Sequence, residues 1–271
     1  DGGSTWTQAT QDSLPAMWNV VVNSVADKHV PQLCYGRFTG KYSYIPDASR
    51  MEIPETGILL DCSGLTADTA YYVYEYDDSG SLAIEASTTV PTTDEGIEVK
   101  TGATTYRSLG FFVPEARIST YQAPIDVEDN RGVDNDFNRF KRSISKFNPF
   151  SGNTVENVAA DTTWRSWNSD GDNFAVKIAL RRPRVLHMLA WIGLVYTAAP
   201  ALGIGVDTKV PYRNAWGRGG IGQSGACQLP ILVDAGSHTL WPIVMGGPGA
   251  PQMYYYYAGW AYAWFTGTVL M

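Results

Sequence analysis

The chain has 271 residues, of which 44% are hydrophobic, 13% are aromatic and only 17% are charged. This hydrophobic share is large enough to build a core and excludes a globally disordered chain. The formal net charge of −7 excludes the basic face that sequence-independent nucleic-acid binding needs, so we expect no nucleic-acid partner.

Turn-forming and aromatic residues together predict an all-β protein. The chain contains 27 Gly, 15 Pro, 16 Tyr and nine Trp. Such a composition is typical of many short strands joined by tight loops. The three cysteines, Cys34, Cys62 and Cys227, lie far apart and form no CxxC pair. We therefore expect reduced thiols, no disulfide framework, no metal site and no cofactor.

Residues 1–30 are expected to form an anchoring segment with one short helix. Ser13 suits the N-cap, Pro15 suits the first turn, and the apolar pattern continues to about Lys28. A single short helix is marginal alone, so its apolar face needs a partner surface, although a helix packed on its own domain fits equally well. The start also lacks the features of a secretory signal peptide. The residues expected to dock are Leu14, Met17, Trp18, Val21 and Val25.

Residues 31–115 are predicted to form a small β domain with two hairpins. The first hairpin pairs residues 70–76, which are rich in aromatic and β-branched side chains, with residues 81–86 across an Asp-Asp-Ser-Gly turn. The second hairpin pairs residues 98–100 with residues 107–112 across a Thr-Gly-Ala-Thr segment. Both hairpins indicate an antiparallel sheet in this part of the chain.

Residues 116–155 are predicted to form a connector. Their first half is acidic and their second half is basic, which suits a linker, a subunit contact or a solvated loop. The acidic run that starts at Asp126 has the composition of a calcium-binding loop. An EF-hand needs glycine at its sixth position and a bidentate acid at its twelfth, but these positions hold Arg131 and Phe137. The run therefore predicts no EF-hand, and irregular calcium binding by its oxygen ligands stays an alternative.

Residues 156–271 are predicted to form a jelly-roll-like β-sandwich. Runs with strand character occupy residues 174–180, 185–197, 201–207 and 238–244. Strands at intervals of about 8–12 residues are typical of a sandwich or a jelly roll. In a further run at residues 260–269, strict alternation places one set of side chains on a single strand face: Trp260, Tyr262, Trp264, Thr266 and Thr268.

Two long stretches without Asp, Glu, Lys or Arg are predicted to be buried strands and not membrane spans. These are residues 186–206 and 239–271. Pro200 and several glycines interrupt the first stretch, and a Gly-Gly-Pro-Gly-Ala-Pro segment breaks the second. We therefore expect no insertion into a membrane.

The residues that hydrolysis requires do not form a recognisable set, so we expect no enzyme. Ser224 lies in a Gly-Gln-Ser-Gly-Ala segment that lacks the final glycine of a nucleophile elbow. Asp170 and Asp172 could be the paired acids of a glycosidase, but their Asn-Ser-Asp-Gly-Asp-Asn setting is typical of a hairpin turn. Only three histidines could serve as a base, and we expect structural roles for them: His29, His187 and His238.

Two groups of aromatic and basic residues are the predicted binding candidates. Residues 210–218 are expected to form a loop between sandwich strands, and such loops commonly carry recognition. Tyr and Trp rings can stack on sugars, and Arg pairs with acidic groups. Packing inside the sandwich or at a subunit interface is the alternative. The candidate residues for binding a glycan or a receptor are Tyr212, Arg213, Trp216, Arg218, Tyr254 and Tyr256.

Several segments resemble structural proteins of tailed bacteriophages. The segments that resemble a small β domain of fibre and virion-appendage proteins are residues 34–39, 63–74, 78–85 and 96–110. In those proteins this domain precedes a jelly-roll-like β-sandwich. Here Leu-Gly-Ile-Gly-Val-Asp at 202–207 and Phe-Thr-Gly-Thr-Val-Leu at 265–270 are similar to strands of that sandwich.

The resemblance implies a structural protein of the virion that is assembled in the host cytoplasm, often as a homotrimer. The partners that it implies are copies of the chain, other virion proteins of the capsid, portal or tail, and a host glycan or receptor. One alternative is a carbohydrate-binding module of a secreted or surface protein. Another alternative is a depolymerase, which would need paired acids in a groove.

Overall fold

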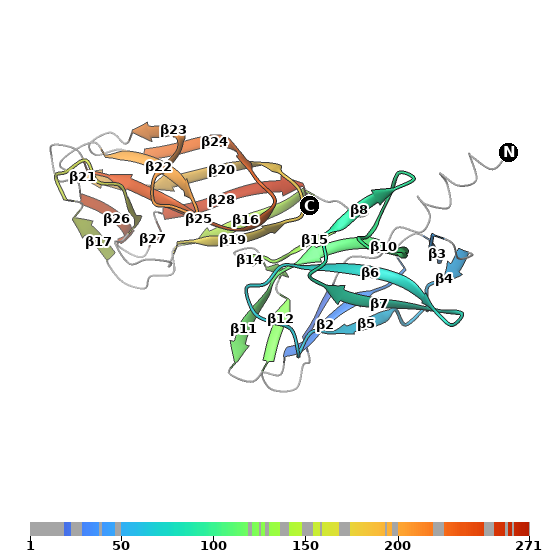
Figure 1. Cartoon of the computed structure of the whole chain (residues 1–271). Coiled ribbons are helices and arrows are strands. Elements are labelled where there is room, and N and C mark those ends of the chain that lie inside the picture. The colour runs from blue at the N-terminus through green and yellow to red at the C-terminus, as the bar shows by residue number, and fades with distance from the viewer. Residues whose placement is uncertain are drawn as a thin grey trace.

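The computed structural model describes residues 19–22, 29–37, 40–46, 50–118, 121–124, 126–127, 130–135, 141–147, 154–157, 159–167, 174–192, 194–196, 200–218, 225–246, 252–257, 260–261 and 263–270. The regular elements in these ranges are β-strands, which confirms the predicted all-β class. Figure 1 shows them in two lobes, one built mainly from the first half of the chain and one from the second. No helix in the described ranges has the length and apolar character needed to cross a membrane.

The largest sheet of the N-terminal lobe contains both predicted hairpins. Its strands, in spatial order, are β7 (Ser81–Ser87), β6 (Tyr71–Asp78), β10 (Ala103–Phe112), β9 (Ile97–Lys100) and β8 (Pro91–Asp94). A sixth strand, β15 (Val133–Asn135), also pairs with β10. The first hairpin joins β6 to β7 through Ser79 and Gly80, which both have positive φ. Glycine suits such a turn because it has no Cβ.

A smaller sheet packs against this one. Its strands are β1 (Asn19–Val22), β2 (His29–Tyr35) and β5 (Ile58–Asp61), in that order. Leu33 and Tyr35 from β2 share a buried cluster with Val73 from β6 and Phe112 from β10. The N-terminal lobe therefore has its own core between two sheets. Two short ladders complete it, namely β3 (Tyr42–Tyr44) with β4 (Arg50–Glu52), and β11 (Pro114–Ile118) with β12 (Tyr121–Pro124).

The structure corrects the predicted N-terminal helix at residues 19–22. These residues form β1, which pairs antiparallel with β2 from Asn19↔Cys34 to Val22↔His29. Valine occupies each of positions 20–22, and β-branched side chains favour strands because their χ1 angle is restricted in a helix. Among the predicted docking residues, Val21 lies at an irregularity in this pairing. The others lie outside the described residues: Leu14, Met17, Trp18 and Val25.

The C-terminal lobe is a β-sandwich, as predicted. Its larger sheet contains, in order, β13 (Asp126–Val127), β14 (Asn130–Arg131), β19 (Val176–Leu180), β25 (Gly236–Met245), β22 (Ala201–Val206) and β23 (Pro211–Arg218), with β18 (Arg165–Ser166) also on β25. The facing sheet contains β16 (Lys141–Phe147), β28 (Ala263–Leu270), β20 (Arg184–Ile192) and β24 (Gly225–Val233). Ile178 and Leu240 from one sheet share a core with Met188 and Phe265 from the other.

A third sheet of the C-terminal lobe contains the tyrosine-rich strand. Its order is β17 (Thr154–Asn157), β26 (Gln252–Tyr257) and β21 (Leu194–Tyr196), and β27 (Trp260–Ala261) pairs with β26. Figure 1 shows this sheet at the end of the lobe that is distant from the N-terminal lobe.

Strands from the predicted connector belong to the sheets of both lobes. β15 joins the N-terminal sheet, whereas β14 pairs in parallel with β19 in the C-terminal lobe. β16 pairs with β28 over seven positions, from Lys141↔Leu270 to Phe147↔Trp264. Ile144 is the apolar residue of β16 that enters the core. The charged residues Lys141, Arg142 and Lys146 surround it, which made this strand resemble a linker.

Candidate functional site

The structure replaces the predicted binding loop with a strand. Residues 211–218 form β23, which pairs with β22 through contacts such as Leu202↔Gly217. The Tyr212 hydroxyl donates a hydrogen bond to the backbone oxygen of Leu232 on β24. Its ring is partly buried against the sandwich core. Tyr212 therefore holds β23 to the neighbouring strand, which is a structural role.

The other binding candidates are divided between two sheets. Arg213, Trp216 and Arg218 lie along β23, at an edge of the larger sheet. Tyr254 and Tyr256 lie on β26 in the third sheet. The side chains of these residues are outside the described part of the structure. The structure does not bring the two groups onto one sheet, and their binding roles stay predictions.

The structure gives the contacts of one histidine ring, that of His238. His238 Nδ1 lies 2.6 Å from Asp207 Oδ2, and its Nε2 lies 3.0 Å from the backbone oxygen of Asp234. Both ring nitrogens thus contact oxygen atoms, so this ring is held as a link between β25 and the loop after β22. His187 is exposed on β20, where its register partners are Thr268 and Pro230.

The other candidates for chemistry are only partly described. The His29 backbone pairs with Val22 in the small sheet. Ser224, Asp170 and Asp172 lie outside the described residues. The described residues contain no group of three or more His, Cys, Asp or Glu arranged to hold a metal ion.

A buried polar cluster occupies the core of the N-terminal lobe. Glu75 is 0% exposed, and its Oε1 lies 3.2 Å from Arg107 Nη1. The Ser43 hydroxyl donates to Oε1 at 2.6 Å, and the Tyr35 hydroxyl donates to Oε2 at 2.8 Å. Burial raises the pKa of Glu75 above its usual range, whereas Arg107 and the two hydroxyls oppose this shift. Because both oxygens are occupied, the cluster joins β2, β3, β6 and β10 and has a structural role.

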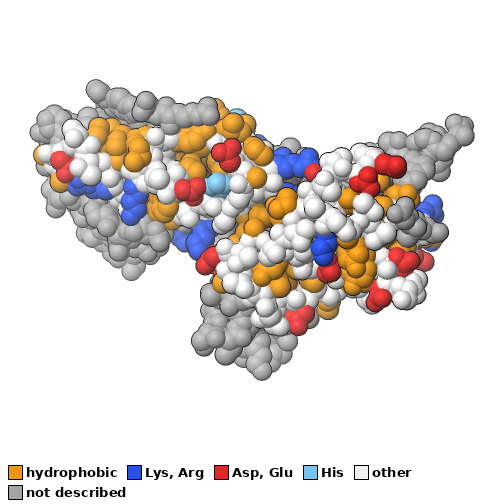
Figure 2. All heavy atoms as spheres, in the orientation of Figure 1, with side chains coloured by type: hydrophobic (Ala, Val, Ile, Leu, Met, Phe, Trp, Pro, Cys, Tyr) orange, Lys and Arg blue, Asp and Glu red, His pale blue; other side chains and the backbone are white. Residues whose placement is uncertain are grey.

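Charged residues tie the two lobes together. Arg181, directly after β19, is buried and forms an ion pair with Glu98 of β9. Its backbone N–H donates to Asp134 Oδ2 on β15 at 2.9 Å. Arg182 pairs with the other oxygen of Glu98 at 2.5 Å. Burial lowers the pKa of Arg181, and Glu98 opposes this shift. Figure 2 shows charged side chains of both signs where the lobes meet.

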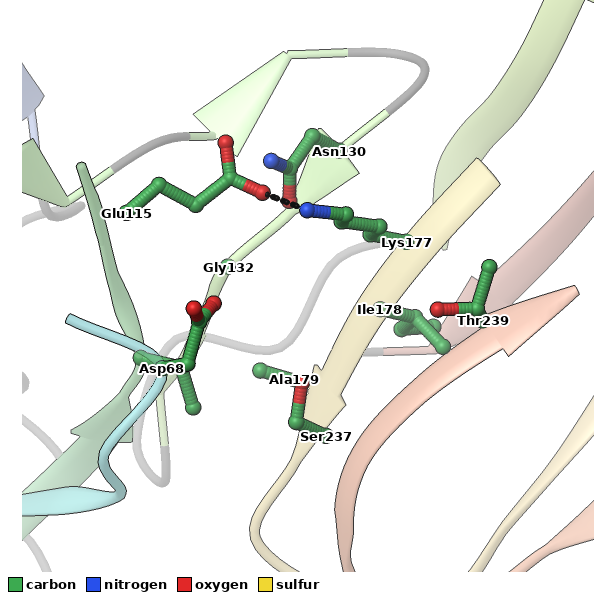
Figure 3. A pocket seen from close by; sticks show the side chains of 10 residues that line it. Asp68, Glu115, Asn130, Gly132, Lys177, Ile178, Ala179, Ser237 and Thr239 are labelled. Carbon is green, nitrogen blue, oxygen red and sulfur yellow. Dashed lines mark hydrogen bonds and ion pairs between the residues drawn. The ribbon is translucent and has the colours of Figure 1, made fainter. Parts of the chain in front are cut away.

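A polar pocket lies beside this junction and is lined from both lobes (Figure 3). Its volume is about 150 Å³. Lys177 Nζ on β19 lies 2.6 Å from Glu115 Oε1 on β11, and Asp68 and Asn130 lie near this pair. None of the described residues that line the pocket is a histidine or a cysteine. The arrangement can hold water or a small polar molecule.

Sequence reasoning did not identify the residues of the junction. The signal was the Arg-Arg-Pro-Arg run at residues 181–184, which interrupts two strongly apolar strands. Three arginines at such a position indicate charged partners elsewhere in the fold. The partners Glu98 and Asp134 are distant in the sequence, so only the tertiary structure identifies them.

No protein-family model matches the chain. No curated protein matches it either. The chain is similar to a chain of a solved structure described as "Structure of infectious bursal disease virus Gx strain", with a TM-score of 0.27 and 11% sequence identity. The match covers 77% of this chain and 53% of that chain, so this chain spans about half the length of the chain it matches.

Proposed function

We propose that the chain is a structural protein of a tailed-phage virion, either a fibre subunit or a subunit that decorates the head or tail. In this proposal its N-terminal part docks on the particle, and its C-terminal sandwich faces outward. Copies of the chain assemble with one another, as a homotrimer in the form that the resemblance implies. The protein has no catalytic role.

The order of the two β lobes carries the proposal. The segments that resemble the phage β domain include the end of β2 and much of β6, β7, β9 and β10, which belong to the N-terminal lobe. The sandwich that should follow such a domain is the C-terminal lobe. A fold order alone does not fix a function, so the proposal also rests on the segments quoted above.

The junction between the lobes supports a structural role. A buried Arg181 that contacts both β9 and β15 restricts motion of one lobe against the other. Removing Glu98 would leave the charge of Arg181, whose side chain is 3% exposed, in a low-dielectric environment, which is costly. A rigid two-lobed body suits a subunit that must project from a particle and keep its direction.

Electron microscopy of particles tests this proposal. Gold-labelled antibodies raised against the full chain would be applied to purified phage particles from cultures that express it. We expect labels at one defined position on the head or tail, and density there that fits both lobes. Particles that lack the chain, or cell fractions that contain it only away from particles, would contradict the proposal.

Glycan binding is a second candidate function, and one observation in the N-terminal lobe favours it. The rings of Tyr76 and Tyr106 stack at 4.5 Å on neighbouring strands, and both side chains are half-buried. Lys100 lies 5.2 Å from the Tyr106 ring and pairs with Glu85. Aromatic surfaces next to charged hydrogen-bonding groups are suited to sugars. This role would be supported if the full chain binds glycans on an array and Tyr76→Ala loses that binding. An array on which the full chain binds no glycan would exclude the role.

A further inference from the structure

The outer face of the four-stranded sheet of the C-terminal lobe is unusually poor in charge. This sheet has the order β16-β28-β20-β24 (Figure 1). Along β20, Leu186, Met188 and Ala190 are fully buried in the sandwich. The alternate residues point to the other side, and we call the outward residues of the four strands the neutral face. Alternation fixes this assignment because successive strand residues point to opposite faces.

Six of the thirteen outward residues whose side chains the structure describes on this sheet are apolar. Val185 on β20 is 49% exposed, and its register partner Leu232 on β24 is 42% exposed. The other apolar members are Leu189, Trp191, Ala226 and Pro230. Two exposed aliphatic side chains at paired positions of neighbouring strands, on the same face as the partly buried Trp191, form a patch that a solvated sheet does not usually carry.

The accessible polar members of the neutral face, apart from Lys141 at the end of β16, can pair with copies of themselves. They are Ser143, Thr266, Thr268 and Gln228, together with His187, whereas Ser145 at the next outward position of β16 is only 7% exposed and is covered within the chain. A hydroxyl, an amide or a neutral imidazole both donates and accepts a hydrogen bond, whereas a carboxylate or an ammonium group cannot bond to its own copy. Residues beside a symmetry axis meet their own copies in a closed oligomer. The composition of the face satisfies this condition.

The charge of the rest of the molecule makes the neutral face the favourable place for two copies to meet. The chain carries a net charge of −7, so copies repel each other at most orientations. Exposed surfaces of soluble domains usually contain roughly 25–35% charged residues. On the neutral face, the described charged side chain is Lys141, which lies at the end of β16. Contact through this face therefore brings few like charges together.

The area of the face is sufficient for a specific interface. Four strands at about 4.8 Å spacing and a strand length of about 30 Å give roughly 550 Å² for each copy. Two copies would bury about 1,100 Å², which exceeds the approximate lower bound of 1,000 Å² for a biological interface. We infer that a second copy of this chain packs on the neutral face and that this contact builds the oligomer.

This inference rests on the proposed function only in that both require copies of the chain to assemble. Sedimentation velocity of the full chain and of three variants tests it. Gln228→Glu adds a charge with almost no change in volume, and Val185→Glu adds one at an exposed site on the face. Val90→Glu is the matched control, because Val90 is 59% exposed and lies in the N-terminal lobe. Circular dichroism melts would show that each variant is folded.

We expect an oligomer for the native chain and for Val90→Glu. For Gln228→Glu and Val185→Glu we expect at least about a tenfold increase in the dissociation constant, because like charges would meet across the interface. A native chain that stays monomeric would overturn the inference, and the face would then be covered by a different virion protein. An oligomer whose dissociation constant is unchanged in Gln228→Glu and Val185→Glu would also overturn the inference, while the proposed function would stand. A face-dependent oligomer that is absent from particles would support the inference and refute the proposed function.

Discussion

Replacing Arg107 with methionine would test how the core of the N-terminal lobe is stabilised. Arg107 is 4% exposed, and its Nη1 lies 3.2 Å from Oε1 of the fully buried Glu75. The same nitrogen donates to the Tyr44 backbone oxygen at 3.1 Å. Methionine retains much of the aliphatic volume but removes the cation. Glu75 would keep only the hydroxyls of Ser43 and Tyr35 as donors.

The expected loss of stability follows from the burial of the Glu75–Arg107 ion pair. Removing one partner of a buried ion pair costs about 3–5 kcal/mol, because the other charge remains poorly solvated. Burial already raises the pKa of Glu75, and loss of Arg107 would raise it further. A carboxyl with a higher pKa in the folded chain stabilises it at low pH, and this contribution is lost as the pH rises through that pKa. The loss in free energy of unfolding caused by Arg107→Met should therefore be larger near pH 8 than near pH 5.

Urea unfolding followed by two probes would measure this effect. All nine tryptophans lie outside residues 19–163, so their fluorescence reports mainly on the C-terminal lobe, whereas far-UV circular dichroism reports on both lobes. With a typical dependence of about 1–3 kcal/mol per molar urea, the circular dichroism midpoint should fall by roughly 2 M. Arg50→Met is the control, because Arg50 is exposed over the Tyr42 ring. A midpoint for Arg107→Met within the error of this control at both pH values would refute the reasoning.

Four further outcomes can be checked with the same preparations. Gly267→Ala should lower stability by about 1–3 kcal/mol in urea unfolding, because the added Cβ would lie 2.2 Å from Met188 Sδ. The Cys62 thiol, whose pKa burial raises to about 12, should resist Ellman's reagent in the folded chain near pH 8 and react after unfolding. Lys177→Ala should change stability by less than about 1 kcal/mol, since its ion pair is half-exposed. Arg181→Ala should cost clearly more, because that side chain is 3% exposed.

Local patterns were sufficient to predict the strands and hairpins of the fold. The turn at Ser79 and Gly80 and the alternation in residues 81–86 gave the β6–β7 hairpin correctly. β16 was missed because charged residues lie on both sides of Ile144, and its partner β28 lies more than a hundred residues later in the chain. β1 was missed because the capping pattern at Ser13 and Pro15 suggested a helix, whereas pairing with β2 favours a strand at residues 19–22.

The candidate sites were harder to predict than the fold, because they depend on contacts between distant residues. Residues 210–218 have the composition expected of a binding loop. Within them, however, the Tyr212 hydroxyl donates a hydrogen bond to the backbone oxygen of Leu232. Glu75 and Arg107 sit in strands whose sequences only suggest alternation, and nothing local indicates that the two charges meet. A residue type gives the chemistry that is available, but the register of the sheets decides where that chemistry is placed.

The apolar character of β20 connects the sequence prediction with the oligomer. Residues 186–206 were predicted to be buried because they contain no Asp, Glu, Lys or Arg, which is typical of strands covered on both faces. Among the described residues, the sandwich buries Leu186, Met188 and Ala190 on one face of β20, whereas Val185 is 49% exposed on the other. An antiparallel strand with a solvated outer face should carry polar residues there. The sequence of β20 is therefore suited to a sheet that is covered twice, once by its own sandwich and once by a second copy of the chain.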